Sequence, residues 1–216
     1  MLTIDYYSDV LCIWAWIAQV RNEELNKQLG SNIEWRHHYI DVFGDTEKKI
    51  QKQWHDRGHY DGFAEHVMSS AKDFEDITVT NNIWTKVRPT TSANAHLVLK
   101  AIELTHNAKR SANFALTLRE AFFINAKDIS NLDILLVLAA ENDFDIGLIK
   151  KVIHNGAAIA ELMSDYQAAK KLGIKGSPSY VLDGGRQTLY GNVGYRVLHA
   201  NVEELLKHPG DEASWC

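Results

Sequence analysis

Two short stretches near the start of the chain alternate hydrophobic and polar residues, and a longer helical pattern separates them. The alternation covers residues 2–7 and 33–39, which predicts two strands. Between them, a helix is expected from about Leu11 to Leu29, where Gly30 ends it. A strand, a crossover helix and a second strand form a βαβ unit, so the two strands should run parallel.

The middle of the chain has a different periodicity. From about residue 46 to residue 167 hydrophobic positions recur mainly every three or four residues, most clearly over 94–107, 110–125, 130–142 and 157–172. Ser130 followed by Asp133 resembles a capping box at the start of the third of these segments. The pattern predicts an all-helical insertion domain over residues 46–167.

The end of the chain returns to strand character. Residues 179–182 form a short apolar run, Asp183-Gly184-Gly185 is typical of a hairpin turn, and residues 187–190 are expected to be the antiparallel partner. A closing helix is predicted from about Tyr195 to Leu206. The order βαβ, helical insert, ββα therefore predicts an α/β fold whose small mixed sheet comes from residues 1–45 and 168–216.

Composition excludes several classes of protein. Of the 216 residues 45% are hydrophobic and 24% are charged, values that are typical of folded globular chains and not of disordered ones. The longest purely apolar run, Ile134–Ala140, is far shorter than the roughly 20 residues that span a bilayer. The first residues lack a signal-peptide pattern and the net charge is −5. We therefore expect a cytoplasmic protein with neither a membrane nor a nucleic-acid partner.

The chain has only two cysteines, Cys12 and Cys216. This count excludes a disulfide framework and a four-cysteine zinc site. Cys12 stands where the first predicted strand leads into the first helix, and the unpaired N–H groups of a helix start stabilise a thiolate. A lowered pKa and a nucleophilic thiol are one interpretation. A buried structural cysteine is the other, and position alone leaves both open.

Residues 8–17, Ser-Asp-Val-Leu-Cys-Ile-Trp-Ala-Trp-Ile, resemble the active-site segment of the DsbA-like thioredoxin-fold superfamily. The resemblance is greatest to its FrnE-type branch, which is related to kappa-class glutathione transferases and 2-hydroxychromene-2-carboxylate isomerases. Four further segments match in the same order along the chain: Glu34-Trp35-Arg36, Phe122-Phe123, Asp128-Ile129, and Gly173-Ile174-Lys175-Gly176-Ser177-Pro178.

This resemblance implies a thioredoxin fold with the helical domain inserted between its two halves. It also implies that the Ser177–Pro178 bond is cis and lies against the thiol, in a loop whose backbone pairs with an extended substrate. Cys12 would be the nucleophile, and Ser177 and Pro178 would present the substrate. Trp14 occupies a position that the family also fills with Trp, where it would line a groove or a homodimer contact, whereas Trp16 is expected in the core.

The sequence departs from the family at one decisive position. The family typically has Cys-Pro-Trp-Cys, and this chain has Cys12-Ile13-Trp14-Ala15, so the resolving thiol is absent. Dithiol oxidase chemistry needs that second thiolate to attack the mixed disulfide. Chemistry through a single thiol is what remains. Cys216 is expected to be an exposed terminal residue without a role, because nothing in the sequence brings it near Cys12.

Other polar residues are weaker candidates. Asn94 and His96 stand where related proteins place polar residues near the substrate, although helix capping and a solvated face explain them equally simply. The segment Gly191–Tyr195 lacks the Asp-Arg pair with which kappa-class relatives hold the γ-glutamyl end of glutathione. His55, His59 and His66 are interpreted as surface histidines, since no further ligand completes a metal site.

The sequence therefore predicts a cytoplasmic thiol–disulfide oxidoreductase that works through Cys12 alone. Its expected partner is a protein with a disulfide or a small thiol, with no tightly bound cofactor or metal and with glutathione as a candidate co-substrate. Two alternatives stay open. One is a glutathione-dependent isomerase or transferase, and the other is a catalytically silent module that holds peptides against the cis-proline loop.

Overall fold

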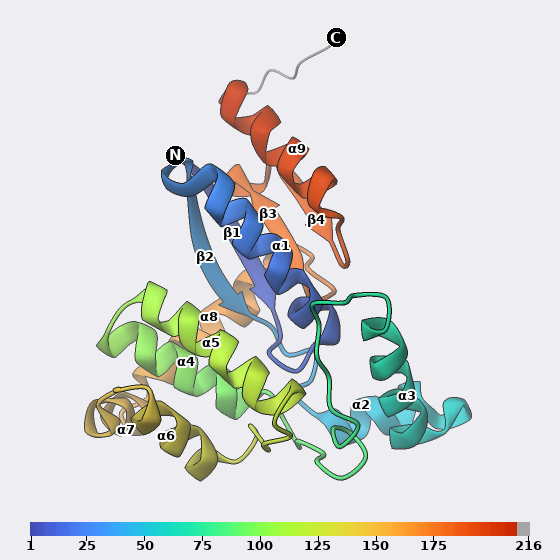
Figure 1. The fold of residues 1–216 in the computed structure, drawn as a ribbon. Helices are drawn as coiled ribbons and strands as arrows, with labels where there is room; N and C mark the ends of the chain where they lie inside the picture. Colours follow the sequence, from blue (N-terminus) through green and yellow to red (C-terminus); the bar gives the residue numbers. More distant parts are fainter. Residues whose placement is uncertain (211–216) are drawn as a thin grey trace.

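A four-stranded sheet with strand order β2-β1-β3-β4 forms one end of the computed structural model, which describes residues 1–210 (Figure 1). Its strands are β1 (Leu2–Ser8), β2 (Ile33–Tyr39), β3 (Ser179–Leu182) and β4 (Gln187–Tyr190). β1 and β2 are parallel, whereas β3 is antiparallel to both β1 and β4. The predicted βαβ unit and the C-terminal hairpin are both confirmed.

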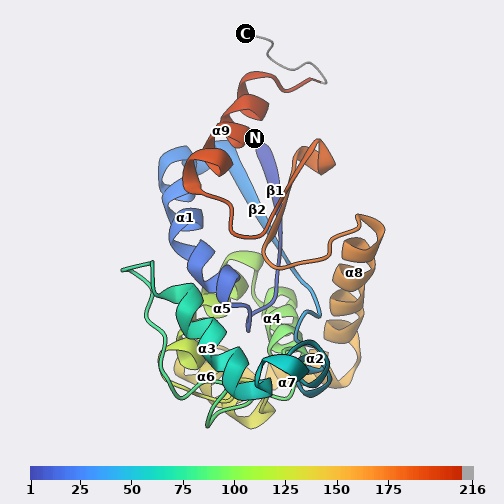
Figure 2. The same ribbon diagram turned by 90° about the vertical axis from the view of Figure 1, so that its right-hand side faces the viewer.

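Two helices cover one face of this sheet, and a third lies on the other face. α1 (Ile13–Leu29) and α9 (Tyr195–Lys207) lie together on the first face, and the C-terminal part of α8 (Ala157–Lys171) approaches the opposite one (Figure 2). Leu25 of α1 and Leu198 and Val202 of α9 are fully buried against Leu2 and Ile4 of β1. This apolar layer fixes α1, and with it the position of Cys12, relative to the sheet.

Between β2 and β3 the chain forms the predicted helical insert at the opposite end of the molecule from the N-terminus (Figure 1). Besides α8, its helices are α2 (Thr46–Gln53), α3 (His59–Ala71), α4 (Ala93–Thr105), α5 (Ala108–Phe123), α6 (Leu132–Glu141) and α7 (Ile146–His154). The four helices that were predicted individually are present within a few residues, and α2, α3 and α7 are additional. The division at residues 45/46 and 167/168 stays a prediction.

The start of the third predicted helix differs from the expected capping box. Asn131, and not Ser130, is the N-cap of α6, and its side chain accepts hydrogen bonds from the amides of Asp133 and Ile134. The hydroxyl of Ser130 instead donates to the carboxylate of Asp128 at 2.6 Å. The prediction was wrong by one residue because Ser130 belongs to the preceding turn.

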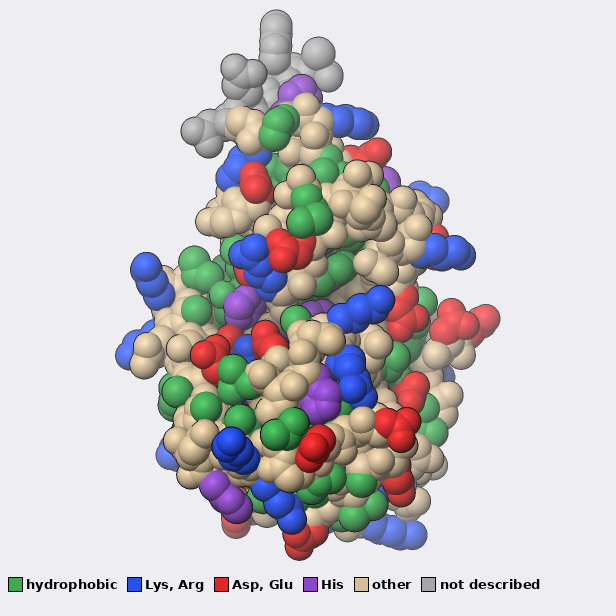
Figure 3. All heavy atoms as spheres, turned by 90° about the vertical axis from the view of Figure 1, so that its left-hand side faces the viewer, with side chains coloured by type: hydrophobic (Ala, Val, Ile, Leu, Met, Phe, Trp, Pro, Cys, Tyr) green, Lys and Arg blue, Asp and Glu red, His purple; other side chains and the backbone are tan. Residues whose placement is uncertain are grey.

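Acidic and basic side chains are interspersed over the face shown in Figure 3, without a large area of one sign. Within residues 1–210, no helix is both long enough and apolar enough to cross a bilayer.

Candidate active site

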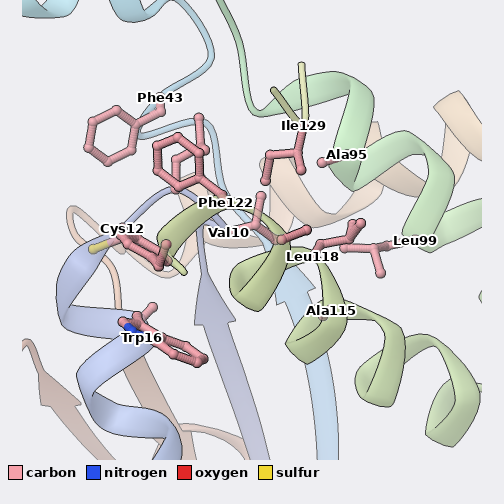
Figure 4. Close-up of a cluster of buried hydrophobic side chains, with 14 of the residues drawn as sticks. Val10, Cys12, Trp16, Phe43, Ala95, Leu99, Ala115, Leu118, Phe122 and Ile129 are labelled. Atoms are coloured by element: carbon pink, nitrogen blue, oxygen red, sulfur yellow. The ribbon is translucent and has the colours of Figure 1, made fainter. Parts of the chain in front are cut away.

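Cys12 is the N-cap of α1, as the sequence predicts. Its backbone is extended (φ −81°, ψ 119°), and its carbonyl accepts hydrogen bonds from the amides of Ala15 and Trp16 at 3.1 Å each. The amide of Cys12 donates to the carbonyl of Asp9 at 3.1 Å, which closes a tight turn between β1 and α1. Figure 4 shows the sulfur pointing away from the apolar cluster around Val10, Leu118 and Leu99.

The sulfur lies against the loop that precedes β3. The Ser177–Pro178 peptide bond is cis, which confirms the expectation drawn from the family resemblance. The thiol donates a hydrogen bond to the carbonyl oxygen of Ser177, with 3.1 Å between sulfur and oxygen. Because β1 and β3 are neighbours in the sheet, the end of one and the start of the other bring Cys12 and Ser177 together.

Burial decides between the two interpretations that the position of Cys12 leaves open. Cys12 is only 6% exposed, and this burial raises the pKa of its thiol above the ordinary value because the thiolate would lose its hydration. A hydrogen bond from the Ser177 side chain and the backbone N–H groups of Ala15 and Trp14 act in the lowering direction, but they do not outweigh desolvation. The effect of the helix start is therefore smaller than the effect of burial, which agrees with the interpretation of Cys12 as a buried cysteine.

Asp9 begins the turn of residues 9–12, here called the thiol turn, and its carboxylate is buried. The sequence offers Ser8 and Asp9 as turn and cap residues, but the N-cap of α1 is Cys12. Its Oδ1 accepts a hydrogen bond from the amide of Leu11 at 2.9 Å, and its Oδ2 accepts from the amide of Phe43 and the hydroxyl of Ser92 at 2.8 Å each. Its own amide donates to Ser177 Oγ at 2.9 Å. Asp9 therefore bonds to the thiol turn, the cis-proline loop and two segments of the chain that flank the helical insert.

His96 supports the thiol turn from below. It has no exposed surface, so the alternative of a solvated face is wrong for this residue. Its Nε2 accepts a hydrogen bond from the amide of Val10 at 3.2 Å, and its ring stacks on Tyr39. Burial, reinforced by Arg119, lowers the pKa of His96 to about 3, so the imidazole is neutral at physiological pH. In this structure His96 reaches the site through the amide of Val10 and through Asp9, whose Oδ1 lies 3.8 Å from its Nε2.

The remaining predicted site residues lie at different depths. Trp14 is half-buried beside the core cluster that contains Cys12. Trp16 is buried as predicted, stacks on Phe123 and donates from its indole to the carbonyl of Thr78 at 3.2 Å. Asn94 donates to the carbonyl of Ser130 at 2.7 Å, which ties the start of α4 to the turn before α6. Their roles toward a substrate stay predictions.

Arg119 is a second residue that the sequence analysis missed. It belongs to α5, is 2% exposed, and donates from Nη2 to Ser8 Oγ at 3.0 Å. Nothing in the sequence distinguishes it, since a single arginine in an amphipathic helix normally faces water. Asp9, by contrast, lies inside the segment that carries the family resemblance, and its place three residues before the thiol was an available signal.

Three further features that the sequence singles out are the segment Gly191–Tyr195, the histidines considered as metal ligands, and Cys216. Arg21 of α1 donates to Asn192 Oδ1 and to the carbonyl of Val193, so the loop that holds glutathione in kappa-class relatives is tied to α1 here. In the described part of the chain no three His, Cys, Asp or Glu side chains are grouped to hold a metal ion. Cys216 lies outside the described residues.

A thiol at the start of the first helix, a cis-proline loop beside it and a helical domain between β2 and β3 together define the class of DsbA-like thioredoxin folds. The family model of the DSBA-like thioredoxin domain matches residues 3–203, and the chain belongs to this family.

Curated relatives include ClpXP adapter proteins named SpxH. The protein from Halalkalibacterium halodurans is 26% identical over 215 residues, which cover 95% of this chain and 68% of that protein. The protein from Bacillus licheniformis is 28% identical over 123 residues, which cover 55% of this chain and 40% of that protein. The chain therefore matches only part of the length of these relatives.

Solved structures share the fold at low sequence identity. A probable DsbA oxidoreductase from Streptomyces coelicolor has a TM-score of 0.78 at 16% identity, with 96% of this chain and 91% of that chain covered. The cytosolic disulfide reductase DsbM from Pseudomonas aeruginosa has a TM-score of 0.69 at 19% identity and covers 95% and 98%. A 2-hydroxychromene-2-carboxylate isomerase has a TM-score of 0.70 at 16% identity and covers 98% and 100%.

Proposed function

We propose that this protein exchanges disulfides through the single thiol of Cys12 and forms a mixed disulfide with its substrate. The observation that carries the proposal is the 3.1 Å contact between the Cys12 sulfur and the carbonyl of Ser177, directly before the cis-proline. An extended substrate that pairs with this loop would lie beside the sulfur. Ala15 stands where the family has its second cysteine, so the mixed disulfide cannot be resolved within the motif.

The reaction balances without a second protein thiol. The Cys12 thiolate attacks one sulfur of a substrate disulfide, a new bond forms between Cys12 and that sulfur, and the other substrate sulfur leaves as a thiolate. An external thiolate then attacks the substrate sulfur of the mixed disulfide and releases Cys12. The chain itself is neither oxidised nor reduced over one cycle, and the external thiol becomes part of the new disulfide.

The partners implied are a protein disulfide or a small disulfide as substrate and a small thiol as co-substrate. Glutathione is the candidate thiol of a reducing compartment, and no tightly bound cofactor is required. The raised pKa of Cys12 leaves little thiolate at neutral pH, so exchange would be slow until the thiol is deprotonated.

A second function, a binding module without redox activity, has its own support. The Cys12 thiol is protonated, buried and engaged as a hydrogen-bond donor to Ser177, which is the state of an unreactive cysteine. The curated relatives are named as adapter proteins, and adapters act by binding. In that function the cis-proline loop would hold a peptide segment of a protein partner, and the thiol would only fill space.

Reaction with glutathione disulfide distinguishes disulfide exchange through Cys12 from a binding module without redox activity. The Cys216→Ser protein is incubated with glutathione disulfide between pH 7 and pH 10, and intact mass is recorded. We expect one glutathione per chain, formed faster at higher pH, removed by excess reduced thiol, and absent from the Cys12→Ser/Cys216→Ser control. A folded protein that gains no adduct at any pH would exclude disulfide exchange and favour the binding module. Saturable binding of reduced glutathione without an adduct would favour the isomerase or transferase alternative.

A further inference from the structure

One buried carboxylate connects the thiol to the helical insert. Leu11 belongs to the thiol turn and Phe43 lies in the connection between β2 and α2. Ser92 is the residue that directly precedes α4. All three donate to the carboxylate of Asp9 at 2.8–2.9 Å, and Asp9 itself has no exposed surface. These three segments are far apart in the sequence. Among residues 1–210, no other polar side chain is hydrogen-bonded to the thiol turn, to the β2–α2 connection and to Ser92 at once.

Both carboxylate oxygens of Asp9 are used. A buried carboxylate is tolerated only when hydrogen bonds replace its hydration, and two backbone amides and one hydroxyl do so here. Asp9 also shares Ser177 with the thiol: its amide donates to Ser177 Oγ, and the thiol donates to the Ser177 carbonyl. Movement of Asp9 would therefore be transmitted to both sides of the sulfur.

We propose that Asp9 is the positioning residue of the thiol site, which holds the thiol turn, the cis-proline loop and the helical insert in one arrangement and places a negative charge close to Cys12. The proposal deepens the proposed function, because it concerns the reactivity of the same thiol. A neutral Asp9 would hold these segments less firmly, and it would remove a charge that opposes the thiolate.

The electrostatic surroundings of Asp9 support this role. Burial raises the pKa of Asp9 to about 6, while its three hydrogen bonds and Arg119 act in the lowering direction. The charge of Asp9 in turn raises the pKa of Cys12, as a smaller contribution than burial. The titratable groups that face Asp9 are Cys12 at the start of α1, Lys49 of α2, His96 of α4, Arg119 of α5 and Tyr166 of α8.

Alkylation of Cys12 by iodoacetamide, measured against pH in a Cys216→Ser background, tests the proposal. We expect Asp9→Asn to lower the apparent pKa of Cys12 and thereby to raise its alkylation rate at pH 7.5 about threefold. Ser92→Ala is the matched control, because it removes one hydrogen bond and keeps the charge. It should leave the apparent pKa of Cys12 unchanged.

Comparison of the two variants separates the charge of Asp9 from simple loosening of the turn. Loosening admits water to the thiol and thereby also lowers its pKa, so Ser92→Ala measures that effect with the charge of Asp9 kept. An unchanged midpoint in Asp9→Asn, or an equal effect of Ser92→Ala, would overturn the proposal. The assay contains no disulfide, so its result does not depend on whether the protein exchanges disulfides.

A measurement on the unaltered protein covers the case in which Asp9→Asn does not fold. Hydrogen exchange of the Leu11 and Phe43 amides, corrected for the intrinsic pH dependence, should show protection that weakens below about pH 6 as Asp9 becomes protonated. Amides of α9, which are remote from Asp9, serve as the internal reference. Protection of Leu11 and Phe43 that stays constant between pH 7 and pH 5 would contradict the role of Asp9.

Discussion

Two opposing effects act on the pKa of the Cys12 thiol. The start of α1 offers backbone N–H groups that stabilise a thiolate, and the surrounding side chains exclude the water that would hydrate it. Desolvation is the larger effect. The same residue in a more open turn would be a strong nucleophile, so the reactivity of this thiol is decided by how tightly its surroundings, which include the Ser177 carbonyl, enclose it.

Alkylation of the unaltered site should therefore be slow at neutral pH. In the Cys216→Ser protein we expect the rate to rise with pH and to reach half its maximum above the ordinary thiol value of about 8.5, because burial disfavours the thiolate. The measurement is the iodoacetamide rate between pH 6 and pH 11, followed by peptide mapping. A midpoint near 7 would mean that the helix start dominates and that the thiol is less enclosed than described.

A second residue-scale prediction concerns a buried ion pair in the insert. Asp165 accepts from Lys100 at 2.9 Å, from His38 at 2.8 Å and from the amide of Tyr39, and the side chains of Lys100 and Asp165 are 5% and 6% exposed. Asp165→Ala leaves the Lys100 ammonium buried without this partner, so the free energy of unfolding should fall by about 3–5 kcal/mol.

The matched control for Asp165 is Glu103, which bonds the same lysine at 3.1 Å from a side chain that is 36% exposed. Glu103→Ala should cost about 0–1 kcal/mol, because solvent already screens that pair. Urea denaturation of both variants measures the difference. Equal losses would show that Lys100 does not need Asp165.

At the scale of elements, the first turn of α1 has the geometry of the family motif with one sulfur removed. Ala15 is fully buried, and its amide donates to the Cys12 carbonyl, so residues 12 and 15 lie one turn apart. The spacing of the family motif is present in the first turn of α1, although the second thiol is absent.

Ala15→Cys in the Cys216→Ser protein should consequently create a redox-active pair. We expect oxidation to remove two hydrogens from the intact mass, and we expect the added sulfur to cost on the order of 1 kcal/mol of stability because the position is fully packed. Ala15→Ser has nearly the same size and cannot form the bond. Failure of the folded double-cysteine protein to oxidise would contradict the placement of Cys12 at the N-cap.

The elements that the sequence predicted well are those whose periodicity is strong and whose ends carry a turn signal. The strands of the sheet and α1, α4, α5, α8 and α9 fall in this group. α2 and α3 were not predicted individually because a short helical turn, His55–Arg57, and Gly58 interrupt the pattern between them, and Gly62 weakens it within α3. At Gly62 a Cβ atom would lie 1.6 Å from the Arg57 carbonyl oxygen, a packing reason that no periodicity reveals.

The candidate site was predictable only where the chain signals it locally. Cys12 and the cis bond before Pro178 followed from sequence motifs and are present. The burial of Cys12 depends in part on Ser177, which is distant in the sequence, so position alone could not decide between a lowered and a raised pKa. The roles of Asp9 and Arg119 likewise arise from contacts that the fold creates.

At the scale of the whole molecule, the buried ionisable groups give stability a definite pH dependence. Burial lowers the pKa of His37 to about 4 and that of His96 to about 3, so between about pH 4 and pH 6.5 the unfolded chain binds more protons and stability rises with pH. Asp165, whose pKa is lowered by His38 and Lys100, acts in the same direction at acid pH. Asp9, with a raised pKa, opposes the rise.

Above about pH 6.5 the free energy of unfolding should fall as the pH rises. Asp165 and Asp5 raise the pKa of His38, so its stabilising charge is present below about 6.5 and is lost as the pH passes its folded value. We expect the free energy of unfolding, measured by urea denaturation from pH 4 to pH 9, to peak near pH 6.5. His96→Gln keeps an acceptor for the Val10 amide and should flatten the acid side of the peak. A continuous fall from pH 4 to pH 6.5 would contradict this assignment of charges.

The position of the insert between β2 and β3 has a consequence for how the chain is made. Cys12 and the strands β1 and β2 are synthesised first, whereas Ser177 and β3, which pair with β1 and cover the sulfur, follow only after the whole insert. Closing so long a stretch of chain costs entropy that the insert reduces once its helices have folded. The thiol is therefore open to oxidants in the growing chain, and its protection is among the last features that the protein acquires.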